Sequence, residues 1–157
     1  MKDMEIQTID NNNFKIPLPE SAPYNHLIWT ADLPTENFPE YELIHAPMEK
    51  FISLCKDPYI SMIEQAVDWE DKLRQHYIDG QEPGKYMMLT PRIAFSVRMI
   101  KKLGIINSFL PTTTVGYVSF VNGRHRVRIA EYLGAEYIPV QIHKSEANNF
   151  KEYLGLK

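Results

Sequence analysis

The sequence predicts a single small α/β domain of mixed α+β structure, in which a small mixed sheet packs with helices. Its 157 residues are 44% hydrophobic, which is enough for one core and too little for two comfortable ones. Residues 115–121 are rich in β-branched and aromatic side chains over the length of a strand. Segments before and after this run place apolar residues at helical spacing.

The first third of the chain predicts an extended segment, two strands and a helix. Residues 1–25 contain three prolines, which suit neither a helix interior nor a central strand, so we expect an extended N-terminal arm and a domain over residues 26–157. The apolar run at residues 27–29 predicts an edge strand, and residues 41–44 predict a second strand. Residues 47–55 begin with a proline that suits a first helical turn and continue with helical apolar spacing.

The later elements are predicted from apolar spacing and from residues that cap helices. Helices are expected over residues 62–80 and over residues 90–104, the second one capped by Thr90. The strand at residues 115–121, a helix over residues 124–134, a strand over residues 137–142 and a final helix capped by Ser145 complete the order.

Charge and cysteine content restrict the class of protein. There are 17 Lys and Arg residues against 20 Asp and Glu, a net charge of −3, so no global field attracts nucleic acid or an anionic membrane, and any anion site must be local. The single cysteine, Cys55, excludes an internal disulfide framework and is expected in the core. Because no apolar segment resembles a signal peptide or a membrane span, we expect a cytoplasmic protein that has no membrane partner.

A basic turn follows the strand predicted in the last third of the chain. Four potentially cationic side chains lie at the start of the next helix: Arg124, His125, Arg126 and Arg128. A helix N-terminus presents unpaired backbone N–H groups at the positive end of the helix dipole, which favours a bound anion. Gly123 allows the backbone to approach that anion closely. Because arginine forks match phosphate oxygens in pairs, the turn predicts a phosphate clamp.

Spacing leaves some roles near the turn open. His125 is the candidate catalytic residue, and it can serve as a proton donor, a metal ligand or a hydrogen-bonding group, since its unperturbed pKa lies near ~6.5. Arg92 also lies at a predicted helix start: it is a further anion ligand if the two helix starts converge, and an exposed first-turn arginine if they do not. The whole turn has the alternative reading of a solvated charged face. Three arginines that oppose a helix dipole are unfavourable without a neutralising anion, which favours the anion site.

The region around this turn has a recognisable order. Residues 116–142 run through a strand, Gly123, a basic group, a helix, a glycine and a strand with an Ile-Pro-Val core. This order, over about a sixth of the chain, resembles the signature region of the ParB/sulfiredoxin superfamily. Its Gly-Arg-His-Arg form is most similar to the plasmid fertility inhibition factors. The resemblance implies a ParB/sulfiredoxin-like domain with a nucleotide or phosphate site carried by Gly123, Arg124, His125 and Arg126.

Asn122 is the departure from the superfamily pattern. Members more often have Asp at this position, whereas an Asn side chain cannot act as a base or as an anionic metal ligand. Asn122 is therefore expected to take part in nucleotide or phosphate binding, and binding is favoured over metal-dependent catalysis. No metal ligand is assigned in the sequence, so the question of a metal stays open.

The resemblance implies a function in plasmid biology. The ligand would be ATP or another nucleotide, and the output would be fertility inhibition, that is, interference with conjugative DNA transfer. Two possibilities stay open for catalysis. Either the protein catalyses no reaction, or it hydrolyses a nucleotide or nucleic acid as a nucleotidase, ATPase or nuclease. The alternative is a non-catalytic protein-interaction module with a degenerate site, whose partner is a component of a type IV secretion or conjugation machine.

Two other functions of the superfamily are not expected. Sulfiredoxin activity needs a cysteine nucleophile in the turn, and Cys55 is the only cysteine. A partition protein would continue into a helix-turn-helix region, and only fifteen residues follow Ile142. Nucleic acid is a weak candidate partner because the net charge is negative.

Overall fold

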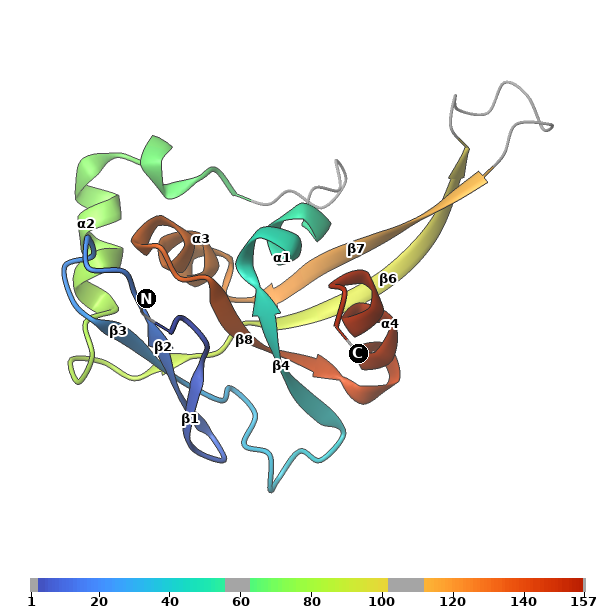
Figure 1. Ribbon diagram of the computed structural model, residues 1–157, viewed down its shortest axis with the longest axis horizontal. Helices are drawn as coiled ribbons and strands as arrows, with labels where there is room; N and C mark the ends of the chain where they lie inside the picture. The colour runs from blue at the N-terminus through green and yellow to red at the C-terminus, as the bar shows by residue number, and fades with distance from the viewer. Residues whose placement is uncertain (1–2, 56–62, 102–111, 157) are drawn as a thin grey trace.

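Two sheets meet in the middle of the molecule, and helices pack around them (Figure 1). A computed structural model describes residues 3–55, 63–101 and 112–156. Within these ranges each sheet has four strands of mixed direction, and four α-helices complete one small domain. The predicted mixed α+β fold is confirmed.

The first sheet is built from the N-terminal part of the chain in the order β1-β2-β3-β5. Its strands are β1 (Gln7–Asp10), β2 (Asn13–Pro17), β3 (His26–Thr30) and β5 (Met88–Leu89). The prediction of an edge strand at residues 27–29 is wrong in its position, because β3 pairs with β2 on one side and β5 on the other. Residues 7–17, expected within the extended arm, supply β1 and β2, and Ile16 is fully buried.

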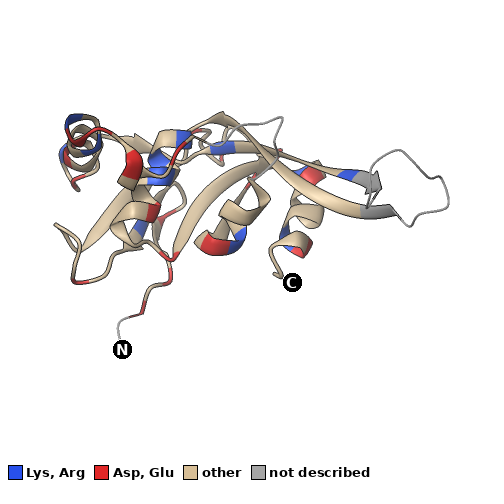
Figure 2. Cartoon of the chain, turned by 90° about the horizontal axis from the view of Figure 1, so that it is seen from above, with Lys and Arg blue, Asp and Glu red and all other residues tan. Residues whose placement is uncertain are grey.

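The second sheet carries the predicted functional turn and has the order β4-β8-β6-β7. Its strands are β4 (Tyr41–Pro47), β8 (Tyr137–His143), β6 (Arg92–Lys101) and β7 (Thr112–Asn122). The predicted strands at residues 41–44, 115–121 and 137–142 are confirmed. The antiparallel pair β6–β7 projects beyond the other elements in both Figure 1 and Figure 2.

The predicted helix over residues 90–104 is wrong in its described part, which forms β6. Apolar side chains at helical spacing suggested the helix, but Ile93 and Phe95 alternate with more exposed neighbours and are both buried, as in a strand. Val97, assigned to the core face of the helix, is 40% exposed. The ladder to β7 runs along all of β6 and outweighs the local helical pattern. Residues 102–104 lie outside the described residues.

The other helices agree with the predictions to different degrees. They are α1 (Met48–Leu54), α2 (Asp71–Gly80), α3 (Arg124–Leu133) and α4 (Lys144–Tyr153). The helix predicted over residues 62–80 is shorter than expected: a single 3₁₀ turn, Ala66–Asp68, precedes α2, and Trp69 between them is extended. Residue 62 lies outside the described residues. Helix α4 is capped by the ring of His143, which accepts from the backbone N–H of Ser145, rather than by Ser145.

The core lies between the two sheets and the helices that cover them. Trp29 of the first sheet, Phe51 of α1 and Phe150 of α4 are fully buried in one continuous cluster. Cys55 is buried in the same cluster, as predicted. Strand β8 is buried along its length between β4 and β6, so its one polar core residue, Gln141, lies where the two sheets approach each other.

Candidate functional site

The turn between β7 and α3 depends on Gly123. Its φ angle of +93° lies in the left-handed region, which favours glycine. A Cβ atom at this position would lie 2.7 Å from the Cβ atom and 2.8 Å from the Cα atom of Pro91. The close approach that requires glycine is therefore to Pro91, just before β6. This packing fixes the start of α3 against the start of β6.

Asn122 is the centre of a polar cluster at this turn. Its Oδ1 atom accepts from the backbone N–H of Arg92 at 2.9 Å and lies 3.4 Å from Nη2 of Arg126, which donates to it. Its Nδ2 atom donates to Oδ2 of Asp32 at 2.9 Å. The amide thus joins a strand start, a helix start and a loop of the first half of the chain. We call Asp32, Arg92, Asn122 and Arg126 the turn cluster.

Arg92 reaches the cluster by strand pairing. Instead of starting a helix, it is the first residue of β6 and pairs with Asn122 of β7. Its Nε atom lies 3.4 Å from Oδ2 of Asp32, and the two side chains are 27% and 15% exposed. The predicted convergence of two helix starts is therefore wrong, and Arg92 lies next to Asn122 because the two residues pair in the β6–β7 ladder.

Both arginines of the cluster have a buried Nε atom that makes no hydrogen bond with the described residues, although the Nε atom of Arg92 lies within ion-pair distance of Asp32. A buried donor left unsatisfied costs about 1–3 kcal/mol. Burial lowers the pKa of the Arg126 guanidinium, while Asp32 and Tyr77 act in the opposite direction. An anion at these guanidinium groups would accept from the buried donors and would stabilise the charged form of Arg126 against burial.

Arg124 and His125 occupy the exposed first turn of α3. The ring of His125 stacks on Tyr77 of α2 with 5.3 Å between centroids and 5° between planes, and it lies 5.7 Å from the ring of Trp69. Burial, with a smaller contribution from Arg124, lowers the pKa of His125 below its ordinary value. Both effects favour the neutral form of the His125 ring, and Tyr77 covers one face of that ring.

Arg128 lies apart from the turn cluster. It is buried, at 9% exposure. Its Nε atom donates to the backbone carbonyl of Ile63 at 2.9 Å, and Nη1 lies 2.8 Å from Oε1 of Glu131. These contacts tie α3 to the segment before the 3₁₀ turn. The predicted phosphate-binding residues thus divide, because Arg92, Asn122 and Arg126 come together and Arg128 holds other groups.

Sequence reasoning missed Asp32 and the buried network that holds it. The backbone N–H of Asp32 donates a hydrogen bond to Oγ1 of Thr90 at 3.1 Å. Gln141 binds both backbone groups of Leu33, accepting from its N–H at 2.9 Å and donating to its carbonyl at 2.7 Å. Gln141 is 1% exposed. A glutamine in an otherwise apolar strand is a signal that points to such a network, whereas the sequence around Asp32 carries none.

Charged residues of both signs are mixed along the described chain. Figure 2 shows Lys and Arg segments interspersed with Asp and Glu segments along the chain, without a side of one sign.

In the described ranges, no group of three or more His, Cys, Asp or Glu side chains is arranged to hold a metal ion. None of the helices in those ranges has the length and apolar character needed to cross a membrane.

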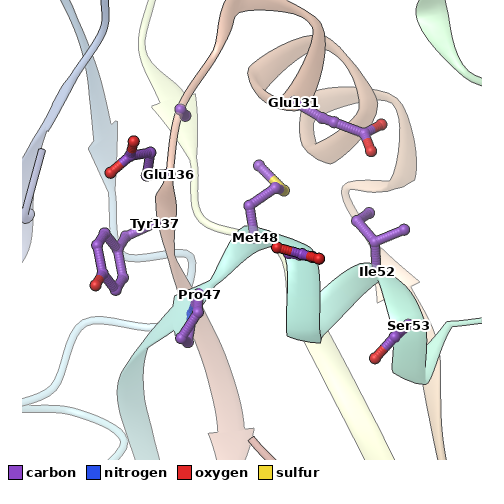
Figure 3. A pocket seen from close by; sticks show the side chains of 9 residues that line it. Pro47, Met48, Ile52, Ser53, Glu131, Glu136 and Tyr137 are labelled. Atoms are coloured by element: carbon purple, nitrogen blue, oxygen red, sulfur yellow. The ribbon is translucent and has the colours of Figure 1, made fainter.

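A separate surface pocket lies between α1, the C-terminal half of α3 and the start of β8. It has a volume of about 650 Å³, and its lining includes three carboxylates, Glu49, Glu131 and Glu136. Figure 3 labels Met48 and Ile52 together with Glu131 and Glu136 among the side chains that line this pocket. The lining contains no member of the turn cluster. The pocket and the turn cluster are therefore two distinct features of the molecule.

Comparison with known proteins adds a family match. The sequence pattern of the family described as Plasmid Fertility inhibition factor matches residues 44–155, more than half of the chain. No curated protein and no solved structure matches the chain. The matched range contains Arg92, Asn122 and Arg126, and Asp32 precedes it.

Proposed function

Because the chain belongs to the plasmid fertility inhibition factor family, we propose that it binds a phosphate-bearing ligand, a nucleotide such as ATP, at the turn cluster. In this proposal the binding serves interference with conjugative DNA transfer. The observation that carries it is the pair of guanidinium groups that meet at Asn122 and Asp32, each with a buried Nε–H that makes no hydrogen bond with the described residues; the Nε atom of Arg92 is ion-paired with Asp32. Such donors match the oxygens of a phosphate group.

The local charge and the helix start support an anion at this place. Within the turn cluster, Arg92 and Arg126 contribute two positive charges and Asp32 contributes one negative charge, so the cluster keeps an excess of one positive charge. The N–H groups of the first turn of α3 add their dipoles to this field. No acidic residue lies in that first turn to neutralise it.

The proposal is binding in preference to hydrolysis. Asn122 occupies the position where an acid would act as a base, and it already uses both ends of its amide within the cluster. The lowered pKa of His125 favours its neutral form, so this side chain is suited to hydrogen bonding and poorly suited to donating a proton. We assign His125 to ligand positioning beside Arg124.

The wider assignment to the ParB/sulfiredoxin superfamily is part of the same proposal. It is supported by the order β7, turn, α3, glycine and β8, with Gly134 at a φ of +94° after the helix. The proposed domain covers residues 26–157. The strands β1 and β2 of residues 1–25 extend its first sheet.

The test is calorimetric titration of the protein with ATP and with tripolyphosphate. Removing a charge-assisted hydrogen bond costs about 1.5–3 kcal/mol, so Arg126→Ala is expected to weaken binding by at least about tenfold, and Arg124→Ala with Arg126→Ala further. Arg98→Ala is the matched control, because it also removes one arginine charge but lies in β6 six positions after Arg92 of the turn cluster. Absence of binding by the wild type, or equal binding by the double variant, would contradict the proposal.

A second candidate function is a non-catalytic interaction module that acts on a component of a transfer machine. The observation that favours it is the carboxylate-lined pocket of Figure 3, which is separate from the turn cluster. Inhibition of conjugation in cells separates the two functions. Loss of inhibition in Glu49→Gln with Glu136→Gln, together with full inhibition by Arg126→Ala, would favour the module; the reverse pattern favours the anion site.

A further inference from the structure

The two carboxylate oxygens of Asp32 have different surroundings. Oδ2 accepts from Asn122 and pairs with Arg92. Oδ1 accepts no hydrogen bond from any described residue, although the side chain is only 15% exposed. The described contacts therefore hold Asp32 through Oδ2 and leave Oδ1 open to a further donor, in the same cluster as the buried Nε–H of Arg126.

The position of Asp32 is fixed by the fold. Its backbone N–H is held by the hydroxyl of Thr90, which is fully buried. The following residue, Leu33, is held through both backbone groups by the buried side chain of Gln141. A carboxylate supported by two buried side chains is pre-organised, unlike an acid on a free loop.

A fixed carboxylate next to a phosphate site changes which anions that site accepts. A ligand phosphate at Arg92 and Arg126 must lie close to Asp32, because the same Arg92 side chain pairs with Asp32. The like charges repel each other, which weakens binding of any anion that brings phosphate groups alone. A ligand that also carries a hydroxyl group near the phosphate can donate to Oδ1 and offset this repulsion.

We propose that Asp32 is a specificity-determining residue that selects nucleoside phosphates through a ribose hydroxyl and disfavours bare polyphosphate. The inference rests on the proposed anion site and names the substrate class of that site. Arg92 and Arg126 hold the phosphate group, and Oδ1 of Asp32 accepts from the sugar. A site that hydrogen-bonds a ligand hydroxyl discriminates strongly against an analogue that lacks it, because the acceptor is then left unpaired.

The test compares ATP, 2′,3′-dideoxy-ATP and tripolyphosphate in calorimetric titrations of the full chain. The wild type is expected to bind ATP about tenfold or more tightly than either analogue. Asp32→Asn is expected to raise the affinity for tripolyphosphate about tenfold and to remove most of the preference for ATP, since the charge is lost while the side-chain shape is kept. Asp68→Asn, at an exposed acid in the 3₁₀ turn, is the control for the change in net charge.

The outcomes separate this inference from the anion site on which it rests. If the wild type binds the three ligands equally, the selection by Asp32 is overturned and the anion site stands; this comparison does not depend on the folding of a variant. If Asp32→Asn keeps the wild-type preference and its tripolyphosphate affinity, the inference is also overturned. If the wild type binds none of the ligands, the anion site itself is wrong, and the inference falls with it.

Discussion

Replacing Gly123 by alanine tests how the candidate site is held together. The backbone at this residue has a φ of +93°, and the added Cβ atom would lie 2.7 Å from the Cβ atom of Pro91. The same atom would lie 3.0 Å from Nη2 of Arg126. The substitution therefore combines backbone strain with a steric overlap in the turn cluster.

Gly84 provides the matched control. Its φ is +84°, and an added Cβ atom would meet nothing within 4 Å. An alanine in the left-handed region costs about 1–2 kcal/mol, of which roughly 0.4–1 kcal/mol is regained from the lower entropy of the unfolded chain. We expect Gly84→Ala to lower the free energy of unfolding by about 1 kcal/mol. Forcing apart packed atoms costs a further ~1–3 kcal/mol, so Gly123→Ala should lose about 2–4 kcal/mol.

Urea denaturation of the wild type and the two variants, followed by circular dichroism, measures these free energies. The difference between Gly123→Ala and Gly84→Ala isolates the overlap with Pro91, because the backbone strain is common to both. Equal destabilisation of the two variants would refute the reasoning. It would mean that Pro91 moves away without cost and does not fix the start of α3.

Three further outcomes are expected. Burial lowers the pKa of His45 and of His125, so their contribution to stability is complete above the unfolded-state pKa of histidine, near ~6.5, and is lost as the pH falls toward the folded-state pKa values. The melting temperature should therefore drop from pH 7.5 to pH 5.5. If His125→Gln leaves the dependence of the melting temperature on pH unchanged, the contribution of that ring is contradicted. Burial raises the pKa of the Cys55 thiol to about 12, so a thiol reagent should label it only in denaturant, and rapid labelling of the native protein would show that the core opens. Gln141→Leu leaves both backbone groups of Leu33 without partners and should cost roughly 2–4 kcal/mol in urea denaturation; a loss below about 0.5 kcal/mol would show that this network is dispensable.

The part of the fold that could be predicted is the part encoded by local signals. The segment from β7 through α3 to β8 carries a β-branched run, a glycine at each end of the helix and a second apolar strand, and all of it is confirmed. Each of these signals acts within a few residues of the structure that it specifies. The basic residues at the start of α3 were found for the same reason.

Strand β6 and Asp32 could not be predicted because their roles depend on distant partners. Residues 92–101 have apolar spacing that fits a helix, and only the ladder with β7 makes them a strand. The sequence therefore predicted Arg92 at a helix start, whereas in the structure Arg92 belongs to the turn cluster because β6 pairs with β7. Asp32 has no capping role and no motif around it; its place in the turn cluster follows from contacts with Asn122 and Thr90 that no local pattern records.

The hydrogen bond between Asn122 and Asp32 spans 90 positions of the chain, and those between Gln141 and Leu33 span 108. Contacts of such sequence separation form late, because the chain must close large loops before they are made. Helix α3 has local contacts and can form much earlier. During synthesis or refolding, the turn cluster thus arises only when the last strand docks beside the first sheet. Binding of the proposed ligand, followed in time, would report the completion of folding and not the appearance of the helix that carries the arginines.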